Sequence, residues 1–523
     1  MPPPAPPPHS STPLSASILV ARFLRSNNYT QTLAAFIEEA GLPEQAGSFE
    51  PGLSDENWTI EKIMDEKKTF DKSLGFERVG GKRGDGLPKW KVPAPSTPTI
   101  IETPSTSNML FVSAQPYTKT MPDGHPQESS IIIATQADKR LSAVDICTGH
   151  SITATYTNIS DSPILCCASL YDGAFRAITD MSGKLYLWQG QGPKLLDVRS
   201  DHTKYAVSVV TWQEEPPEVQ KTWLATAGWD SKILIYYITP PDVGGQLAIG
   251  EPVAYIKTET VPECIQFIRN RETGDLDLIV SRRDSTNLYY YLVESPINRI
   301  EKENNKHIRL VKMQECPLLG KQNLAPHSNA WVAFSPAWFA QSPRDPNLLA
   351  VATSSQPHMR LIIVKMLIPT QPSQSQTQQQ AQPSAAPMSS SQSRVPVGRP
   401  AARGEVPRAL QHGFAELALQ NREDAAILVQ VNTMAPQTPY SIPQVAWRPD
   451  GSGVWVNGDD GLIRGFETRT GKLITTLRNG HEAGSKVRSI WAGAVPVLEG
   501  RGEDGVEEWV LSGGFDKKLI VWK

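Results

Sequence analysis

The glycine- and lysine-rich stretch at 75–83 (GFERVGGKR) comes nearest, in residue type and spacing, to a motif that does chemistry. Gly75 and Gly80 have the separation of the two glycines in a phosphate-binding loop, whose backbone N–H groups cradle phosphate oxygens. Another glycine then precedes Lys82, and Arg83 occupies the position of the Ser or Thr that should bind magnesium. No apolar strand precedes the stretch. We therefore interpret it as a flexible, mildly basic linker and not as a nucleotide site.

Motifs for other kinds of catalysis and for metal binding are missing from the sequence. It contains no G-x-S-x-G, H-E-x-x-H or C-x-x-C pattern, and its 9 histidines are scattered without metal-ligand spacing. These absences predict that the chain is not an enzyme and uses no cofactor or metal. The cysteines form an odd set without the spacing of a disulfide framework, so we expect buried free thiols. They are Cys147, Cys166, Cys167, Cys264 and Cys316.

The charge and hydropathy of the chain restrict its partners and its compartment. Lysine plus arginine number 51 and aspartate plus glutamate 54, so the net charge of −3 predicts no general attraction to nucleic acid or anionic membranes. A basic stripe with interleaved aromatic residues is also missing. The sequence has no run of about 18 apolar residues that would span a membrane, and its N-terminus lacks the regions of a secretory signal. We expect a cytoplasmic or nuclear protein that is not secreted.

Two compositionally biased segments divide the chain, whose 523 residues predict two to three domains or one large repeat architecture. Residues 1–13 are rich in proline and predict a disordered tail. Residues 369–424 contain a Gln/Ser/Pro-rich insertion that cannot support a core and is predicted to be disordered. Near its end, the run RALQHGFAELALQ favours a short helix.

Residues 14–45 have the pattern of two short amphipathic helices. Ser15 or Ser17 can cap the first helix, Asn28 interrupts it, and Thr30 is a suitable N-cap for the second. The apolar residues of the second helix recur at i, i+3, i+4 and i+7, and a Gly and a Pro end it. So small a unit cannot bury a core alone. A second copy of the hairpin is the simplest partner for its apolar stripe.

This hairpin resembles a LisH motif, which has an aromatic–Leu pair, a Tyr five residues further on, and then Thr, Phe and Glu. LisH motifs are two-helix dimerisation units, so the resemblance implies a homodimer. The chain departs from the pattern at Asn28, where Gly is usual, and at Leu33, where Ala is usual. Docking of the hairpin on this chain's own second domain is the alternative. The residues predicted to dimerise are Leu19, Phe23, Leu24, Tyr29, Leu33, Phe36 and Ile37.

Residues 46–96 mix charge with glycine and are predicted to form a linker. A short helix fits the apolar spacing between about 59 and 70. We do not match this stretch to the CTLH motif that often follows LisH. This linker would set the distance over which the hairpin can extend from the β-propeller predicted from residue 97 onward.

From residue 97 onward the chain repeats a strand–turn–strand pattern seven times. The C-terminal unit, EEWVLSGGFDKKLIVWK, shows it most clearly, with a turn of Gly, Gly and Asp between two strands, the second ending in an aromatic residue. One unit, FRAITDMSGKLYLW, has Ser182 at the turn position, and another, LLAVATSSQPHMRLIIVKM, keeps neither signature residue. The other units keep the turn aspartate, as Asp138, Asp230, Asp284, Asp460 and Asp516.

These units resemble degenerate WD repeats, and the resemblance implies four strands per repeat. A single repeat cannot bury its faces, so the repeats must close into a ring. We predict a mainly β chain, with a seven-bladed WD-repeat-like β-propeller over 97–523 that follows a small N-terminal α-helical LisH-like hairpin. The outer strand of the last blade should come from 98–103 (PTIIET), which removes a free sheet edge. The insertion at 369–424 falls before the fourth strand of blade five (AAILVQVNTM).

The WD resemblance also implies buried His–Ser/Thr–Asp–Trp hydrogen-bond chains. A hydrolytic triad is the alternative interpretation of such sets, but their spacing belongs to the repeat, and buried polar groups need partners. We therefore expect structural networks. The residues so implied are His202, Thr226, Asp230 and Tyr236 in one blade, with Tyr in place of Trp, and His481, Ser512, Asp516 and Trp522 in another.

We interpret the chain as a non-enzymatic dimeric scaffold or adaptor. The hairpin would form the homodimer, and the propeller faces would bind protein partners in a multi-subunit complex. LisH and WD repeats occur together in ubiquitin-ligase, dynein/microtubule and transcription-regulatory assemblies. Direct nucleic-acid binding and membrane contact are not expected. Two alternatives stay open: a propeller-based enzyme with loop-borne catalytic acids, and a monomeric architectural subunit.

Overall fold

The computed structural model divides the chain into two compact units, 1–85 and 86–523, which are described separately. The residues that the structure describes are 16–48, 60, 86–120, 126–146, 149–190, 194–214, 222–238, 246–293, 313–326, 334–369, 408–496 and 506–523. The near-miss phosphate loop at 75–83, Cys147 and the tail at 1–13 therefore lie outside the described residues. The helix predicted over 59–70 does so too, apart from Ile60.

The first unit contains the two predicted helices, α1 (Ala16–Ser26) and α2 (Thr30–Glu39). Asn28, between them, has a φ of 60°, in the left-handed region that favours glycine and that Asn tolerates best among the other residues. This explains how Asn28 can stand where LisH motifs usually have Gly. The prediction that Thr30 caps α2 is wrong, because the helix begins at Thr30, and Tyr29 precedes it without a side-chain cap.

The chain after α2 returns to α1 and completes the core of this unit. Gly41 has a φ of 62°, and the amides of Gly41 and Leu42 donate to the carbonyls of Glu38 and Ile37, which ends the helix in a Schellman motif. Arg25 then donates from Nη2 to the Glu44 and Ala46 carbonyl oxygens, at 2.8 and 3.1 Å. The buried side chains are Ala21, Leu33 and Ala46, with Leu24, Phe36, Ile37 and Leu42 packed against them.

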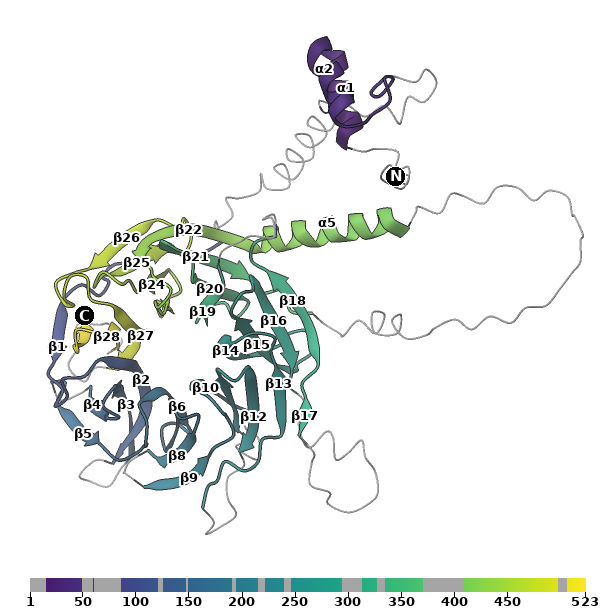
Figure 1. The fold of residues 1–523 in the computed structure, drawn as a ribbon. Helices are drawn as coiled ribbons and strands as arrows, with labels where there is room; N and C mark the ends of the chain where they lie inside the picture. The colour runs from purple at the N-terminus through teal and green to yellow at the C-terminus, as the bar shows by residue number, and fades with distance from the viewer. Residues whose placement is uncertain are drawn as a thin grey trace, which may run out of the picture. The chain divides into compact units, whose positions relative to one another are not determined.

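Seven sheets form the blades of the second unit and surround a common centre (Figure 1). The first three blades are β2 (Met109–Thr120), β3 (Pro126–Gln136), β4 (Leu141–Asp145) and β5 (Ile152–Tyr156); β6 (Ile164–Leu170), β7 (Phe175–Asp180), β8 (Leu185–Gln189) and β9 (Leu195–Arg199); and β10 (Ala206–Gln213), β11 (Thr222–Gly228), β12 (Lys232–Ile238) and β13 (Ala254–Lys257), with β17 (Gln314–Glu315) added in parallel. The seven-bladed propeller predicted from the sequence is confirmed.

The remaining four blades follow in chain order, and the last takes one strand from the start of the unit. They are β14 (Pro262–Arg269), β15 (Leu276–Arg282), β16 (Asn287–Leu292) and β18 (Leu318–Asn323); β19 (Pro336–Gln341), β20 (Leu348–Thr353), β21 (His358–Lys365) and β22 (Ile427–Pro436); β23 (Val445–Trp447), β24 (Gly453–Val456), β25 (Ile463–Glu467) and β26 (Leu473–Leu477); and β27 (Val487–Pro496), β28 (Val506–Gly514), β29 (Leu519–Trp522) and β1 (Pro98–Ile101).

Apolar side chains on both faces of each blade hold the ring together. Successive residues of a strand point to opposite faces of its sheet, so the strands between two neighbours need apolar residues at almost every position. In β3, Ile131 and Ile133 pack with blade two, whereas Ile132 and Ala134 pack with blade seven. Seven such clusters each join one adjacent pair of blades.

The ring closes as the sequence predicted. Strand β1 pairs antiparallel with β29, with Pro98 opposite Trp522 and Ile101 opposite Leu519. The amides of Ser96 and Thr97 also donate to the Lys523 carbonyl oxygen, at 2.8 and 2.9 Å. The last blade therefore contains strands from both ends of the unit.

Residues 86–96 lie on blades six and seven, which corrects the prediction that the linker extends to residue 96. The Trp90 ring meets Trp455 edge-on at 5.3 Å, and the Arg448 guanidinium lies 4.3 Å from its centroid. The Trp90 amide donates to Glu467 at 3.0 Å, and buried Arg448 pairs with Glu508 at 2.6 Å. We call 86–96 the strap.

Helix α5 (Arg408–Ala426) corrects the prediction that all of 369–424 is disordered, and it extends the short helix expected from RALQHGFAELALQ. It leads directly into β22, the predicted fourth strand of blade five, and its buried Glu423 accepts a hydrogen bond from the Asn323 amide at 2.7 Å. Residues 370–407 are outside the described residues.

Candidate functional site

One end of every blade gathers the turns that carry the signature aspartates. The start of a blade's first strand pairs with the end of its second, as Ala206 does with Gly228. The connection into the first strand and the turn between the second and third strands therefore lie at the same end. We call this end the turn face. The predicted polar networks and the aromatic residues considered below lie at or beneath it.

The four residues predicted in blade seven form a continuous hydrogen-bond chain. His481 Nδ1 lies 3.0 Å from Asp516 Oδ1, and its Nε2 lies 2.8 Å from Ser512 Oγ. The indole Nε1 of Trp522 donates to the same Ser512 oxygen at 2.8 Å. Asp516 also accepts from the Glu482 amide at 3.0 Å. The network ties the connection into β27 to the β28–β29 turn.

The blade-three set is brought together too, except that Tyr236 turns to a different acceptor. His202 Nδ1 lies 3.0 Å from Asp230 Oδ1, and its Nε2 lies 2.8 Å from Thr226 Oγ1. The Tyr236 hydroxyl donates to Asp201 Oδ2 at 3.0 Å. Replacing Trp by Tyr thus moves the last link of the chain from the strand hydroxyl to a carboxylate on the connecting loop.

Burial and hydrogen bonding make these networks structural in character. Burial raises the pKa of the Asp230 and Asp516 carboxyls, but the hydrogen bond and charge of the facing histidine outweigh it and hold each pKa below its usual value. The hydroxyls that a hydrolase would use as nucleophiles belong to Thr226 and Ser512, both of which are fully buried. A substrate cannot reach them at the turn face.

A glycine two residues before the turn aspartate makes room for each histidine. A Cβ on Gly228 would lie 2.3 Å from His202 Nδ1, and one on Gly514 would lie 2.8 Å from His481 Nδ1. Both would also come within 2.4 Å of the neighbouring aspartate oxygen. Both networks share this G-x-D spacing, visible as AGWD and GGFD, but Gly458 and Asp460 have it too, beside Arg464 in place of a histidine.

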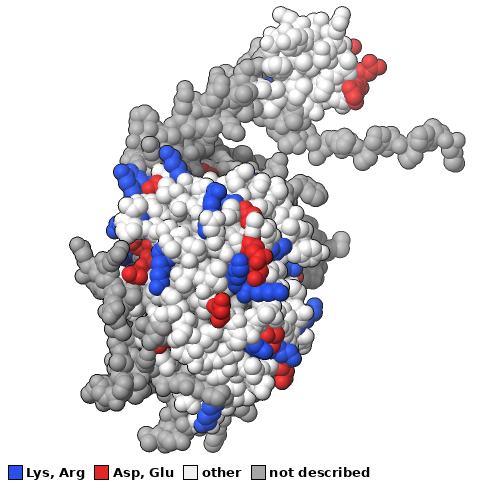
Figure 2. Space-filling view, turned by 90° about the vertical axis from the view of Figure 1, so that its left-hand side faces the viewer, with Lys and Arg blue, Asp and Glu red and all other residues white. Residues whose placement is uncertain are grey.

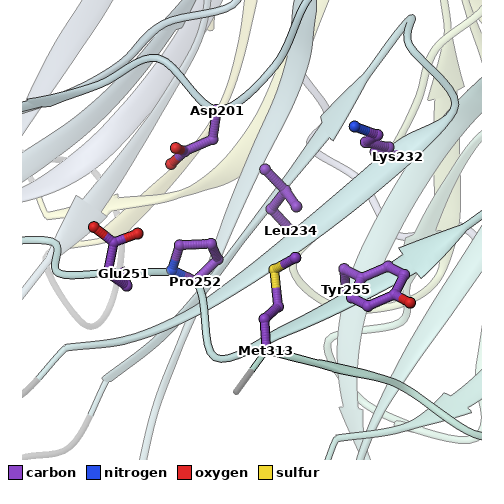
Figure 3. Close-up of a pocket in the computed structure, with 7 residues that line it drawn as sticks. All are labelled: Asp201, Lys232, Leu234, Glu251, Pro252, Tyr255 and Met313. Carbon is purple, nitrogen blue, oxygen red and sulfur yellow. The ribbon is translucent and has the colours of Figure 1, made fainter. Parts of the chain in front are cut away.

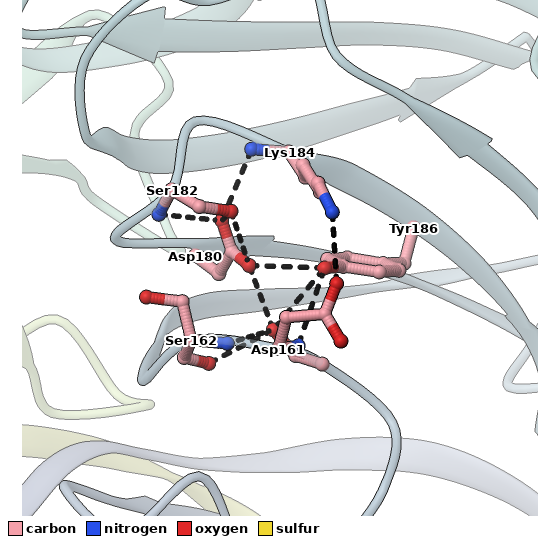
Figure 4. Close-up of polar contacts among 7 residues, drawn as sticks. Asp161, Ser162, Asp180, Ser182, Lys184 and Tyr186 are labelled. Atoms are coloured by element: carbon pink, nitrogen blue, oxygen red, sulfur yellow. Dashed lines mark hydrogen bonds and ion pairs between the residues drawn. The ribbon is translucent and has the colours of Figure 1, made fainter.

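Blade two replaces the histidine network with one centred on Asp180, which sequence reasoning missed (Figure 4). Fully buried Asp180 accepts from Ser160 at 2.7 Å, from Tyr186 at 3.1 Å and from Ser182 at 2.7 Å. The repeat pattern pointed to Ser182 as the substitute for the turn aspartate. The carboxylate instead comes from the end of β7, two residues earlier, and Ser182 hydrogen-bonds to it.

The other turn aspartates have partners from different residue types. Asp460 pairs with Arg464 at 2.6 Å, and Asp138 accepts from Ser105 at 2.7 Å. Asp284 has a φ of 58°, and its amide donates to Ser335 at 3.0 Å. The turn position is therefore retained in these blades, whereas the histidine is not.

Several aromatic residues are exposed on the turn face. Trp229 and Tyr205 stack with ring centroids 5.0 Å apart, and each is 40% exposed. Arg283 lies 5.7 Å from the Trp229 ring and pairs with Glu263 at 2.7 Å. Phe515, which precedes Asp516 as Trp229 precedes Asp230, is also exposed. Large apolar groups exposed together on one face are typical of a binding surface.

The residues predicted to dimerise separate into two sets in the first unit. Leu24, Leu33, Phe36 and Ile37 belong to the unit's own core, as described above. Leu19, Phe23 and Tyr29 lie outside it. Phe23 and Tyr29 are in contact, with ring centroids 6.4 Å apart, and Tyr29 is 52% exposed. In the second set Tyr29 is exposed, whereas Leu19 and Phe23 are half-buried.

A cavity of about 540 Å³ lies at the outer side of blade three, with side chains from β12, β13 and the preceding loops directed toward it (Figure 3). Two of its acidic residues are already neutralised, because Arg199 pairs with Asp201 at 2.9 Å and with Glu251 at 2.7 Å. Tyr255 and Met313 supply apolar lining. Arg199 therefore offsets the charges of both carboxylates of the cavity, and Lys232 adds a further basic side chain to its lining.

The cysteine prediction is confirmed for the described residues. Cys166, Cys167 and Cys264 are buried free thiols, Cys316 is buried as well, and burial raises the pKa of Cys167 to about 11. Within the described ranges, no group of three or more His, Cys, Asp and Glu side chains could hold a metal ion. No helix in the described part of the chain is long and apolar enough to cross a bilayer. On the face of the propeller seen in Figure 2, acidic and basic side chains are interspersed.

Two family models match the chain, in the order expected from the sequence. The model described as UCP007778, LisH domain, matches residues 15–43, and the model described as UCP007778, beta-propeller domain, matches residues 333–522. The chain carries a LisH domain and a β-propeller domain. No curated protein matches the chain.

The two matches fit the structural boundaries. The LisH match spans both helices and ends at Pro43, just before the segment that folds back on α1. The propeller match spans blades five to seven, and the structure shows that four further blades complete the ring. A LisH domain joined to a propeller is the arrangement of a protein-interaction scaffold.

Proposed function

We propose that the chain is a non-enzymatic dimeric adaptor, whose LisH domain pairs two copies and whose propeller binds protein partners at the turn face. The observation that carries this proposal is the stacked Tyr205–Trp229 pair, exposed on a rigid ring beside Arg283. Aromatic and Arg side chains dominate the energetics of protein interfaces. The inaccessible Ser512 and Thr226 hydroxyls favour binding over catalysis.

Dimerisation would make the adaptor bivalent. Two propellers in one particle raise the effective concentration of the second site for any partner that carries two copies of a motif. The apolar set Leu19, Phe23 and Tyr29 supports pairing because it lies outside the unit's own core. We place the adaptor in the cytoplasm or nucleus, bound to proteins and not to nucleic acid.

The experiment compares partner capture by the full chain with capture by a chain that lacks residues 1–85. The truncation ends at Asp85 because the strap, including Trp90, belongs to the propeller unit. We expect both proteins to fold and the full chain to retain a defined set of partners at lower bait concentration, because only the full chain is dimeric. A Trp229→Ser full-length variant is the matched control for the turn face.

Specific results would contradict the proposal. If Trp229→Ser captures the same partners with the same yield, the turn face is not the binding surface. If the full chain and the truncated chain have the same subunit number in solution, the LisH domain does not dimerise. Turnover of a substrate that depends on the cavity acids Asp201 or Glu251 would favour the enzymatic alternative.

A further inference from the structure

Arg488 occupies a repeated structural position at the inner edge of the ring. The first strands of six blades contain a β-bulge near the turn face, where one residue has no cross-strand partner. These strands lie around the centre of the ring in Figure 1. The residues at the bulges are Leu110, Leu165, Val207, Glu263, Ala337 and Arg488.

Two of these bulge residues are charged, and one of the two is already neutralised. Glu263 pairs with Arg283 at 2.7 Å. In contrast, the Nε of Arg488 is buried without a hydrogen-bond partner among the described residues. Burial lowers the pKa of Arg488 to about 10, and no charged side chain contributes to the shift. Arg488 as a whole is half-buried, and a guanidinium that is partly removed from water without a counter-charge is costly to the folded state.

Exposed apolar residues surround the connection that leads to Arg488. The side-chain Nδ2 of Asn457 donates to the backbone carbonyls of Ile442 and Val487, at 2.8 and 2.7 Å. It thereby holds the two segments side by side. Tyr440 in the same loop is 86% exposed and Ile442 is 37% exposed. On the other side, the amide of exposed Phe515 donates to the Lys486 carbonyl at 2.9 Å.

The neighbouring lysine does not duplicate the role of Arg488. Lys486 Nζ lies 3.0 Å from Asp459 Oδ2 and donates to Thr438 Oγ1 at 2.9 Å. Its charge is therefore balanced within the protein. The surface formed by Tyr440, Ile442, Arg488 and Phe515, which we call the Arg488 surface, combines apolar groups with one unbalanced positive charge.

We propose that the Arg488 surface binds a protein segment in which an Asp or Glu carboxylate is flanked by apolar side chains. The carboxylate would accept hydrogen bonds from the Arg488 guanidinium, and the apolar side chains would cover Tyr440, Ile442 and Phe515. Charge-assisted hydrogen bonds of this kind are the strong ones. The inference rests on the proposed adaptor function and names the chemistry of its partner.

The first test is the effect of Arg488→Met on stability, measured by thermal unfolding of the full chain. Methionine keeps an apolar stem and removes the charge, so we expect Tm to rise by about 2 °C or more. Arg464→Met is the matched control on the same face, because Arg464 is buried and paired with Asp460 at 2.6 Å. It should lower Tm. A fall in Tm for Arg488→Met would assign Arg488 a structural role and overturn the proposal.

The second test measures binding to arrays of nine-residue peptides with randomised flanks and a fixed central Glu, beside matched arrays with a central Gln. We expect the full chain to select Glu peptides with apolar flanks at least tenfold over their Gln counterparts, and Arg488→Met to lose that selection. Arg464→Met should keep it. Equal binding to the Glu and Gln arrays, or selection that survives in Arg488→Met, would overturn the proposal.

Further outcomes separate this inference from the adaptor function. Stronger binding to phosphopeptides or to single-stranded oligonucleotides than to Glu peptides, lost in Arg488→Met, would show an anion site for another class of ligand and reject the carboxylate. If partner capture depends on Trp229 but is unchanged by Arg488→Met, the adaptor function stands and this inference fails. If neither variant changes capture, the turn-face proposal itself fails.

Discussion

A buried histidine stabilises a turn only when both ring nitrogens have partners, and a neighbouring glycine makes that geometry accessible here. His481 bridges Ser512 and Asp516 because Gly514 leaves room for its ring. The same arrangement recurs around Gly228 in blade three. One backbone position without a side chain therefore controls two hydrogen bonds, which tie the connection into β27 to strand β28 and to the turn that follows it.

We predict that Gly514→Ala lowers the free energy of unfolding by about 2–3 kcal/mol, because the added Cβ displaces the histidine and leaves buried polar atoms unpaired. Urea unfolding of the full chain measures the effect. Gly86→Ala is the control, since a Cβ there meets nothing within 4 Å. The two variants should differ clearly, and equal stabilities would show that the network relaxes without cost.

Asp277 is a second residue whose environment has a measurable consequence. It is fully buried on β15, and neither carboxylate oxygen has a hydrogen-bond partner among the described residues. Burial, followed by the charge of Asp275, raises the pKa of Asp277 to about 7. The Asn270 side chain lowers that pKa, but by a smaller amount. An unfolded Asp titrates near 3.9, so the native state binds more protons between about pH 4 and pH 7.

The sign of the pH dependence follows from that proton uptake. The Asp277 contribution makes the free energy of unfolding fall as pH rises from about 4 to 7 and level off above. We predict that Asp277→Asn is more stable than the parent at pH 8, by on the order of 2–4 kcal/mol, and gains little at pH 4.5. Urea unfolding at both pH values measures this. Exposed Asp275→Asn should show a much smaller difference, and a pH-independent gain for Asp277→Asn would refute the assignment.

At the residue scale, the sequence predicted only what the repeat spacing contains. The links among His481, Ser512, Asp516 and Trp522 were predictable because they recur at fixed positions in the repeat. Asp180 was missed, since its carboxylate enters from a strand end and not from the turn. Arg488 was missed because its position at a β-bulge cannot be recognised from the residue types in the sequence. Neither residue produces a periodic signal that could be recognised in one sequence.

At the element scale, the strands were predictable from the alternation of residue types and from the turn residues between them. The position of the strap was not, because it depends on contacts between residues that lie far apart in the sequence. The closing strand β1 was predictable because a blade with three strands must borrow a fourth. Trp90 offers no such constraint. It fits against Gly453 and Gly465, where a Cβ would lie 2.3 and 2.6 Å from its ring. Those glycines lie far along the chain, so no local pattern connects them with Trp90.

We predict that Trp90→Ala lowers the free energy of unfolding of the propeller by about 2–4 kcal/mol, because it opens a cavity beside Trp455 and exposes the Arg448–Glu508 pair. Urea unfolding followed by tryptophan fluorescence and circular dichroism measures the loss. Val92→Ala, in the same strap but 83% exposed, is the control and should be close to neutral. A neutral Trp90→Ala would mean that the strap contributes little to the ring.

Helix α5 shows how composition and pattern can disagree within one insertion. The Gln, Ser and Pro content of 369–424 predicted disorder throughout, but a helical pattern begins at 408 and runs into β22. Composition is averaged over a window of residues, so it does not show where the helical pattern begins within the insertion. The periodic apolar residues were visible in RALQHGFAELALQ and were the better guide.

At the scale of the whole molecule, the two compact units each bury apolar side chains of their own. The propeller buries its core between neighbouring blades and closes through β1, so we expect it to fold without the LisH domain. The LisH domain has a small core of its own, and Leu19, Phe23 and Tyr29 are not part of that cluster. The sequence predicted both units, but not which apolar residues of the hairpin face inward, because its two helices expose more apolar positions than one core can use.

This division leads to a prediction about oligomeric state. Phe23→Asp places a charge outside the unit's core, so we expect the mass in solution to fall from twice 57.4 kDa to 57.4 kDa while the Tm of the propeller stays unchanged. Light scattering coupled to size exclusion measures the mass, and calorimetry measures Tm. Leu33→Asp is the contrasting variant, because Leu33 is buried and its loss should also remove helical signal from the LisH domain. A Phe23→Asp protein that keeps the dimer mass would place the interface elsewhere, and one whose propeller melts earlier would show that the two units are not independent.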